Sequence, residues 1–569
     1  MFVRVAKNKN TCSVRIVHNV RENGKVMQKL IQYLGVAKTD EELEKLKKLG
    51  ETEIRRLKLE EEKAQGLKKL PFYNEQMDLH PELFYSAKKG RKAAKKLEDI
   101  LPVHNVTLDQ VVEDKRIVEG VHEVLVPLYK SLGFDDILTS KKDKERLLSL
   151  VLSRIVKPES KHKTQKSLVR YFNQNHDLDA LYRTLDKVHD QIPQIKTITF
   201  QKTKELFPNT NFVLYDVTTL AFETEKSDDL RAKGYSKDCK FNTSQVVLAL
   251  ASNQDGLPIG YELFQGNKAE VSTLMESIES WKKLFDIQSV TFVADRAMMS
   301  EENLKLMDAQ GYKYIVACKL KTLDQKAQNH ILNKDNYTEC DSSLVMEFMH
   351  TKKETKNNIN PQSRRIIVSY KKERADRDKA KRQTLIDKMI KKTDQKGCIP
   401  TKNLLNNQGI KQITKTDKAK TEIDYEKIKE LEKWDGLHGI ITNINDQSAT
   451  TLLSQYKSLW KIEECFRLNK HTLSMRPIYH FKQTRIEAHI AICYMAFSML
   501  RHIEYRVALI GKISVNDIIE ELMNVQASIV IHKKTHDKYR IPSRMSHAAS
   551  AIYKAMNIQR SPDTQIYLD

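Results

Sequence analysis

Apolar runs separated by polar turns dominate the middle of the chain. A helical pattern from about Val271 to Phe285 lies among them. Continuous apolar strands combined with a helix are typical of a sheet that is covered on both faces. We therefore expect an α/β core that begins near residue 206, with strands at residues 212–215, 244–252, 257–266, 289–294 and 312–320.

The first 70 residues have a different pattern. Residues 1–35 alternate apolar and polar positions, and Asn23-Gly24 stands between two such runs. This dipeptide predicts a β-hairpin, because both of its residues adopt the positive φ that a two-residue turn requires. A highly charged helix is expected to follow, from residue 39 to about residue 63.

Residues 71–205 show mainly helical periodicity and many basic residues. Within them, residues 160–172 (SKHKTQKSLVRYF) form a basic helical segment. Such a segment lies on the phosphates of a nucleic acid in some proteins and is only a solvated surface helix in others. Composition alone leaves both interpretations open.

The strand pattern changes again between residues 321 and 433. Two short strands, SLVMEFMH and RRIIVSY, and a charged helix, KKERADRDKAKRQTLIDKM, precede GIITNI at residues 439–444, which resumes the sheet. We interpret residues 321–433 as a β-rich inserted domain. The core would then occupy residues 206–320 and 434–510, and residues 511–569 would form a C-terminal helical region.

Charge and cysteine content narrow the class of protein. The 569 residues carry a formal net charge of +22, with 97 Lys and Arg against 75 Asp and Glu, so polyanions are attracted and nucleic acid is the expected partner. The seven cysteines form no CxxC pair, which argues against a zinc module or a disulfide framework and fits a reducing cytoplasm. The most apolar helical stretch, residues 490–500, is too short to span a membrane, and no membrane partner is expected.

Two of the predicted strands end in an aspartate. Asp216 follows the apolar run 212–215, and Asp295 follows Val290 to Ala294. A single aspartate at such a place commonly caps a turn. Two of them on strands of one sheet can instead meet at the same edge, where ligands bind in α/β proteins, and carboxylate oxygens are ligands for Mg²⁺.

A third acid is expected from a helical segment that runs to about Thr472. At helical spacing, one stripe contains Tyr456, Leu459, Glu463, Arg467 and Lys470. The acid on this stripe could bind a metal while its basic neighbours bind phosphate. Taken by itself, however, the segment favours an exposed ion pair between Glu463 and Arg467.

These residues carry a resemblance to a known family. The order Tyr, two residues, Arg, three residues, Glu, six residues, Lys is matched by Tyr456, Glu463 and Lys470, with Leu459 in place of the Arg. In this respect the chain resembles bacterial insertion-sequence transposases of the DDE type, in the family named after insertion sequence four, whose catalytic core is RNase H-like. Further similarity lies in YDVTTLAFE, GYSKD, QVVLAL, GNKAEVSTL, VMQKLIQYLG, SYKKERADRDKAKR and VADRAMMS, the last with Ala297 where Gly is usual.

The resemblance implies a metal-dependent DNA enzyme. Asp216, Asp295 and Glu463 would be the catalytic residues and the ligands of Mg²⁺, for which Mn²⁺ should substitute, and Glu464 is the rival for the third position. Asp216 would bridge two metal ions, which activate water and stabilise the departing 3′ oxygen. Because Leu459 cannot bind phosphate as an Arg would, Lys457, Lys461 or Arg467 would supply that positive charge. The residues expected to contact DNA are Tyr456, Lys461, Arg467, Lys470, Arg296 and Trp434.

The resemblance also implies an activity and its partners. A homodimer in the bacterial cytoplasm, on nucleoid DNA, would bind the terminal inverted repeats of double-stranded transposon ends and then cleave and join DNA by cut-and-paste, with a hairpin intermediate. Two alternatives stay open. One is a nuclease or resolvase that does not join ends, and the other is a catalytically silent DNA-binding derivative, against which the three intact acids argue.

Trp434 has two interpretations. It precedes the last sheet strand, and a Trp in such a place usually packs a junction between two parts of a protein. A sharply bent DNA hairpin could instead extrude a base that stacks on its ring. Trp460, off the stripe of Glu463, is a weaker candidate for the same role.

Overall fold

The computed structural model describes most of the chain as two compact units. One unit contains residues 128–501, and the other combines residues 1–127 with residues 502–569. The described residues are 2–8, 11–22, 25–37, 107–207, 212–234, 242–284, 291–295, 300–340, 343–351, 362–391, 413–417 and 420–567.

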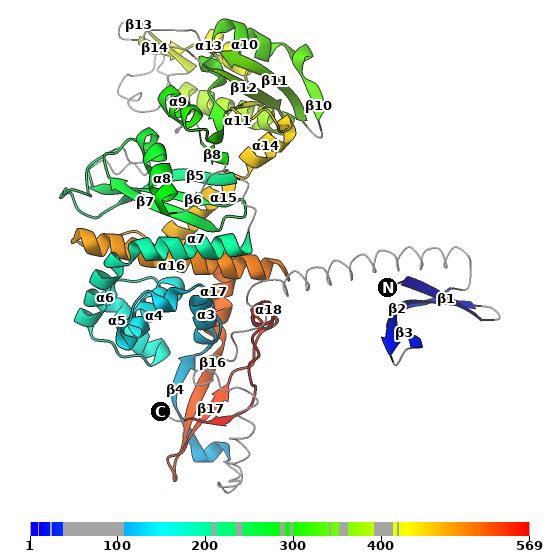
Figure 1. The fold of residues 1–569 in the computed structure, drawn as a ribbon, viewed down its shortest axis with the longest axis vertical. Helices are drawn as coiled ribbons and strands as arrows, with labels where there is room; N and C mark the ends of the chain where they lie inside the picture. Colours follow the sequence, from blue (N-terminus) through cyan, green and yellow to red (C-terminus); the bar gives the residue numbers. More distant parts are fainter. Residues whose placement is uncertain are drawn as a thin grey trace. The chain divides into compact units, whose positions relative to one another are not determined.

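A nine-stranded mixed sheet forms the centre of the unit 128–501 (Figure 1), in the order β10-β11-β12-β15-β9-β8-β5-β6-β7. Strand β8 is parallel to both β5 and β9, and the remaining pairs are antiparallel. The predicted α/β core is confirmed. The strands are β5 Phe212–Ala221, β6 Gln245–Ser252, β7 Pro258–Gln265, β8 Thr291–Ala294, β9 Lys313–Cys318, β10 Thr338–Cys340, β11 Ser343–Thr351, β12 Ser363–Tyr370 and β15 Leu437–Thr442.

Helices cover this sheet and complete its core. The helices α8 Glu270–Leu284, α9 Glu301–Ala309 and α10 Gln325–Leu332 contribute buried residues to one large apolar cluster with the sheet. In that cluster the ring of Trp281 lies 5.9 Å from the ring of Tyr215 on β5. Helix α16 Gln483–Ala508 also packs on the sheet: the ring of its Tyr494 lies 4.7 Å from the ring of Tyr261 on β7. Helix α16 is buried from Ile490 to Leu500, as a core helix should be.

A layer of four helices precedes the sheet in the chain. These helices are α4 Lys141–Val156, α5 Lys161–Phe172, α6 Leu178–Asp190 and α7 Ile192–Leu206. Helix α7 packs on β7, where Thr203 donates a 2.7 Å hydrogen bond to the carbonyl of Pro258. The helical pattern predicted for this part of the chain is thus present.

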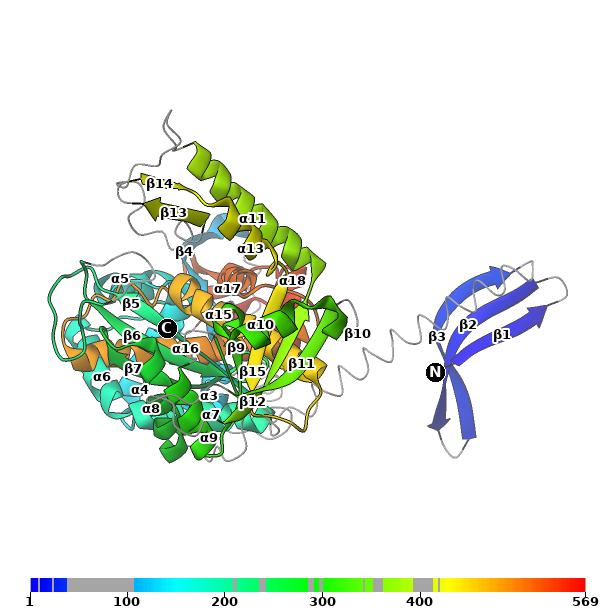
Figure 2. The same cartoon turned by 90° about the horizontal axis from the view of Figure 1, so that it is seen from above.

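The first strands of the insertion extend the core sheet, whereas β13 and β14 form a separate two-stranded sheet. Strand β12 pairs with β15 of the core, and β10 and β11 continue the same sheet outward, because the buried run of β12 finds an equally apolar partner there. Only the second half of the insertion has its own small core, made by Ile386, Met389, Ile413 and Ile428. It comprises α11 Lys372–Ile390, β13 Thr414–Asp417, β14 Lys420–Ile423 and α13 Tyr425–Glu432, which lie together in Figure 2.

The N-terminal residues form a three-stranded antiparallel sheet, β1 Phe2–Asn8, β2 Thr11–Glu22 and β3 Lys25–Ala37. Glu22 of β2 pairs with Lys25 of β3, so the predicted pairing of these two strands is present, whereas Asn23 and Gly24 themselves lie outside the described residues. The charged helix expected after residue 39 lies outside the described residues.

A second sheet combines distant parts of the chain, in the order β18-β17-β16-β4. Strand β4 Val111–Val118 comes from the region expected to be helical, and β16 Gln526–His532, β17 Lys538–Pro542 and β18 Gln565–Ile566 come from the C-terminal region, also expected to be helical. Both expectations were therefore incomplete. The helices beside it are α3 Gly120–Ser131, α17 Val515–Asn524 and α18 His547–Ala555.

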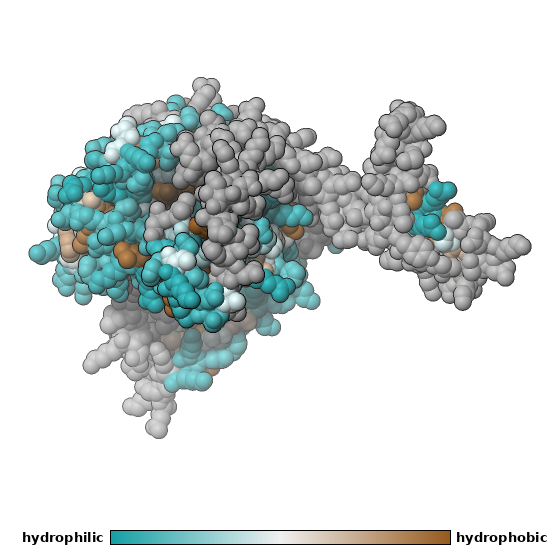
Figure 3. Space-filling model, turned by 90° about the horizontal axis from the view of Figure 1, so that it is seen from below, coloured by the Kyte–Doolittle hydropathy of each residue, from teal (hydrophilic) through white to brown (hydrophobic). Residues whose placement is uncertain are grey.

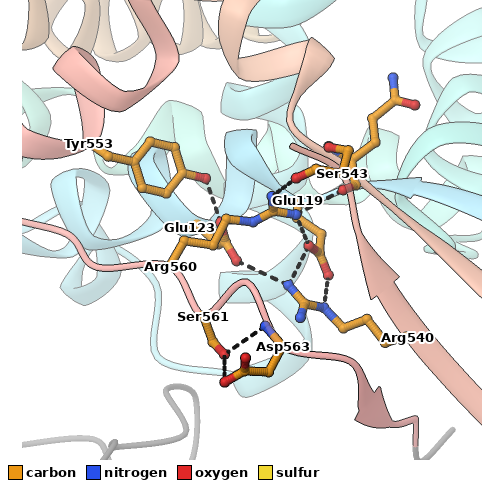
Figure 4. A network of polar contacts seen from close by, with 9 residues as sticks. Glu119, Glu123, Arg540, Ser543, Tyr553, Arg560, Ser561 and Asp563 are labelled. Carbon is orange, nitrogen blue, oxygen red and sulfur yellow. Dashed lines mark hydrogen bonds and ion pairs between the residues drawn. The ribbon is translucent and has the colours of Figure 1, made fainter. Parts of the chain in front are cut away.

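Ion pairs join the two segments of this unit (Figure 4). Glu119, just before α3, accepts hydrogen bonds from Arg540 on β17 and from Arg560, with Nη2 to Oε2 distances of 2.6 Å in both cases. Glu123 accepts a hydrogen bond from the hydroxyl of Tyr553 on α18. Arg560 is almost fully buried, so these contacts fix the C-terminal segment onto the start of α3.

The described surface is largely polar. Figure 3 shows a face on which the described residues are predominantly hydrophilic, with only scattered hydrophobic ones. Within the described residues, no helix is both long enough and apolar enough to cross a membrane.

Candidate active site

Asp216 and Asp295 lie side by side in the core sheet. Tyr215 of β5 pairs with Ala294 of the parallel strand β8, and each aspartate is the next residue along its strand. Neighbouring strands are about 4.8 Å apart. Tyr215 and Ala294 both belong to the cluster that α8 fills, so alternation directs the side chain of Asp216 to the other face of the sheet.

Asp216 does not cap a turn. Strand β5 continues past it to Ala221, and Asp216 is the one half-buried position in a strand that is otherwise buried. Its Oδ1 accepts a 2.7 Å hydrogen bond from the backbone N–H of Val217. The expectation that the strand ends at Asp216 is therefore wrong, because the apolar residues beyond it continue the pairing with β6. Asp295, by contrast, directly follows the last residue of β8 and is exposed.

The segment that carries Glu463 is not one continuous α-helix. Helix α14 spans Ala449–Lys457, α15 spans Trp460–Arg467, and Leu468–Thr472 forms a π-helical turn. Leu459, in the break, is buried, whereas Glu463 and Arg467 are exposed. The expected single stripe is thus interrupted, because its members lie on separate helical segments and Leu459 is buried.

Glu463 and Glu464 differ in their contacts. Glu464 forms ion pairs with Arg467 at 3.1 Å and with the buried Arg501 at 3.9 Å. Among the described residues Glu463 makes no hydrogen bond or ion pair, so the expected pair between Glu463 and Arg467 is replaced by one to Glu464. Helix α15 packs on β5 and β6, which brings the element of Glu463 to the strand of Asp216.

The residues expected to contact DNA have varied surroundings. Arg467 is exposed and forms an ion pair with Glu464. The Nζ of Lys461 donates a 2.6 Å hydrogen bond to the carbonyl of Gln254 and lies 3.6 Å from Asp255, so part of its charge is already compensated. Lys470 lies in the π-helical turn, and such turns occur frequently at functional sites. Arg296 lies outside the described residues.

Two aromatic candidates differ in exposure. Trp434, in the turn between α13 and β15, is half-buried and packs against the apolar cluster of the core sheet. Trp460 at the start of α15 is exposed. The packing interpretation of Trp434 is supported by this contact, and its role towards DNA stays a prediction.

Sequence patterns did not indicate His438. Its ring, at the start of β15, lies 5.1 Å from the ring of Tyr456 on α14. Burial, together with the charges of Arg374 and Lys457, lowers the pKa of His438 to about 4, and the charge of Asp295 acts in the opposite direction. His438 is therefore within electrostatic range of the second acid and of basic side chains from α11 and α14. These neighbours are remote in sequence, so no spacing could reveal them.

The donor set suits a hard divalent cation. Two carboxylates lie side by side, and such pairs bind Mg²⁺ together with water and substrate phosphate. Among the described residues no group of three or more Asp, Glu, His or Cys side chains is close enough to hold a metal. The roles of Asp216, Asp295 and Glu463 as metal ligands therefore stay predictions.

The mixed sheet and its covering helices form an RNase H-like core, the fold of nucleic-acid-processing enzymes of the DDE class. Residues 208–499, more than half of the 569-residue chain, match the family model described as Transposase DDE domain, and the chain belongs to this family. Its core is RNase H-like, and divalent metal ions are general in the family. No curated protein matches the chain.

A second match refines this assignment. Residues 3–65 match the model described as IS1634 family transposase, N-terminal domain. The chain is thus an insertion-sequence transposase, an enzyme class that cleaves and rejoins DNA. The branch named by the match is IS1634, so membership of the insertion-sequence-four family is not confirmed.

Proposed function

We propose that this transposase binds the terminal inverted repeats of its own element and moves it by cut-and-paste, through metal-dependent cleavage, a hairpin intermediate and strand transfer. The observation that supports this most is the alignment of Asp216 and Asp295 on adjacent parallel strands. Two carboxylates held this close repel each other, and a divalent cation between them offsets that repulsion.

Each acid has a distinct part in the proposal. Asp216, fixed within a strand, is the more rigid ligand, and Asp295 at the strand end is the more accessible one. Glu463 completes the site when substrate and metal are bound, because it has no competing partner in the described structure. Bound Mg²⁺, or Mn²⁺ in its place, would supply an activated water and stabilise the leaving oxygen.

Basic side chains around the acids provide the DNA contacts. Lys470 and Arg467 follow Glu463 on the next turns, and the charges of Arg374 and Lys457 act on His438, as does that of Asp295. Arg296 would add a further contact beside Asp295. We also propose that a homodimer holds two transposon ends, that the protein acts on the nucleoid in the cytoplasm, and that the N-terminal 209 residues contribute most of the specific end recognition.

The test uses the full chain. A fragment that ends near residue 209 would lack β16, the partner of β4, and β7, the partner of α7, so it is not a suitable substitute. The chain is mixed with a labelled duplex that carries the end of the element and its flanking DNA, and with target plasmid, in the presence of Mg²⁺ or of a chelator. Metal-dependent cleavage followed by joining to the plasmid is expected.

The products separate the alternatives. Cleavage without joining would indicate a nuclease or resolvase, and end binding without cleavage would indicate a silent derivative. A product in which the two strands of one end are covalently joined would demonstrate the hairpin. Equal binding to unrelated DNA at every salt concentration would contradict specific end recognition.

A further inference from the structure

A group of basic side chains is buried away from the three acids. It comprises Arg154 on α4, Lys161 at the start of α5, His480 in the loop after the π-helical turn, and His489 on α16. Their exposed fractions are 6 %, 4 %, 7 % and 3 %, respectively. We call these four residues the basic cluster. All of them lie within the unit 128–501.

Backbone carbonyls, and not carboxylates, hold the basic cluster. Arg154 donates hydrogen bonds to the carbonyls of Ser474 and Glu159, both at 3.3 Å. The Nε2 of His489 lies 3.2 Å from the carbonyl of Met475, and the rings of His480 and His489 are 5.4 Å apart. The loop between the π-helical turn and α16 is therefore fixed onto α4.

The basic cluster lacks a negative charge. Among the described residues, the Nζ of Lys161 forms no hydrogen bond or ion pair. The carboxylate of Glu159 is engaged elsewhere, by Ser167 at 2.7 Å and by Lys157 at 4.0 Å. Arg485, whose charge lowers the pKa of His480, is paired with Asp186 at 2.8 Å. Buried cations are normally paired, so an uncompensated group of this kind indicates a missing anion.

The protonation states of the basic cluster agree with the lack of a compensating anion. Burial, assisted by the charge of Arg154, lowers the pKa of Lys161 to about 7, and the thiol of Cys493 is the group that acts in the opposite direction. Burial and the neighbouring cations lower the pKa of His480 to about 3, so this imidazole is neutral and can donate one N–H. Near neutral pH the available charges are those of Arg154 and, in part, Lys161.

The surface beside the cluster is accessible to DNA. Tyr479 and Phe481, on either side of His480 in the chain, are 61 % and 74 % exposed. Lys161 is also the first residue of α5, a helix of 12 residues, and helix N-termini favour anions. The loop follows the turn that contains Lys470, next to the helix of Glu463.

We propose that the basic cluster binds a phosphate group of the DNA backbone, with Lys161, Arg154 and His480 as its contacts. This inference rests on the DNA-binding function proposed above, and the site is separate from the metal-binding acids. It also assigns a role to the basic segment 160–172: the first residue of its helix contacts DNA from a buried position.

Binding of this phosphate requires Lys161 to be protonated. In the protein without DNA the pKa of Lys161 is about 7, so above that pH the lysine must take up a proton when phosphate binds. DNA affinity should therefore fall as the pH rises through this value. The charged and titratable groups that face Lys161 are Arg154 on α4, Cys493 and His489 on α16, and His480 in the loop before α16. Arg154 stays charged throughout.

The experiment compares full-length wild type with Lys161→Met, Lys161→Arg and Lys204→Met. Lys204 is an exposed lysine on α7 and serves as the matched control. Affinity for a short fluorescent DNA duplex is measured by anisotropy at several salt concentrations, at about pH 6 and about pH 8.5, on either side of the lysine titration. Thermal unfolding is followed with inorganic phosphate and with chloride at equal ionic strength.

Lys161→Met should bind the duplex about tenfold more weakly at low salt and at the lower pH. For Lys161→Met, the slope of log affinity against log salt concentration should be smaller in magnitude by about one, the value expected when one phosphate contact is removed. The pH dependence should disappear in Lys161→Met and persist in Lys204→Met, and Lys161→Arg should retain most of the affinity without the pH dependence. Inorganic phosphate should raise the Tm of wild type and not that of Lys161→Met.

A lysine that binds no phosphate gives other results. Lys161→Met would then be as stable as wild type or more so, with unchanged affinity, salt dependence and pH dependence, and this outcome would overturn the inference alone. A wild-type chain that fails to bind DNA under any of these conditions would contradict the proposed function as well.

Discussion

Asp216 and Asp295 occupy equivalent positions on two neighbouring parallel strands, one residue beyond the pair formed by Tyr215 and Ala294. This alignment depends only on backbone hydrogen bonds, so it exists before any metal or DNA is bound. The single changes Asp216→Ala and Asp295→Ala should each reduce metal-dependent cleavage by about a thousandfold or more, because each removes a ligand. End binding and the Tm should change little. Asp229→Ala, an exposed aspartate outside the site, is the control and should cleave normally.

Substitutions of Glu463 and of Glu464 should differ in their effects on cleavage and on stability. Glu463→Gln is expected to abolish cleavage without lowering the Tm, since Glu463 has no partner among the described residues. Glu464→Gln should retain cleavage and lose about 1 kcal/mol of stability, because Glu464 pairs with the buried Arg501. Cleavage assays and denaturant titrations on both variants decide the matter. An inactive Glu464→Gln beside an active Glu463→Gln would show that the third acid is Glu464.

Trp434→Ala tests two roles of one side chain. Because Trp434 packs on the core cluster, its removal should lower the free energy of unfolding by about 2 kcal/mol. If the ring also receives an extruded base, the variant should still nick the end and accumulate nicked product without hairpin, and an abasic site at that position should partly restore the hairpin. Joint loss of nicking and stability would support packing alone. Trp460→Ala, which alters an exposed ring, is the comparison.

Asp143 should make stability depend on pH. The hydrogen bond from Lys187 on α6, at 2.5 Å, holds the pKa of Asp143 below its usual value, and Arg146 contributes in the same direction. A lowered pKa in the folded state gives stability that is complete above the unfolded value of about 3.9 and is lost as the pH falls through the folded value. Asp143→Asn should therefore cost about 1 to 2 kcal/mol at neutral pH. The difference from wild type should shrink in acid, and a difference that stays constant down to the lowest pH would contradict this explanation.

Arg560 should be essential to the four-stranded sheet. It donates to Glu119 and to the carbonyls of Ser543 and Gln526, and it is almost fully buried. Arg560→Ala leaves the carboxylates near it partly uncompensated and should destabilise this unit by about 3 kcal/mol. Arg560→Lys should recover only part of the loss, because an ammonium group cannot form the same fork of hydrogen bonds. Arg544→Ala, at an exposed position, should leave unfolding unchanged.

Local patterns predicted the elements whose partners are near in sequence. Asn23-Gly24 predicted the pairing of β2 with β3, and the apolar runs predicted β5 to β9 in the expected places. The same patterns did not reveal that β12 joins the core sheet, because its partner β15 follows a long insertion. They also did not reveal β4 and β16, two strands that are far apart in the chain and pair with each other.

The candidate site shows the same limit. Asp216 and Asp295 could be predicted from apolar strands interrupted by an acid. Helical spacing did not predict that the helix is broken near Leu459 or that this residue is buried. His438 lies near Asp295 through a strand that is far from it in the chain. Tertiary structure, and not periodicity, places these residues around the acids.

The pairing of β4 with β16 has a consequence for how the protein is made. Arg540 and Glu119 are separated by 421 positions, so a ribosome that adds about 5 to 20 residues per second needs roughly 20 to 80 seconds between them. During that interval the strand at residues 111–118 has left the ribosome without a neighbour, while the residues of the catalytic sheet are being completed. A nascent chain that has just passed residue 501 can thus hold a finished core together with an open strand edge, and only the last part of translation closes it.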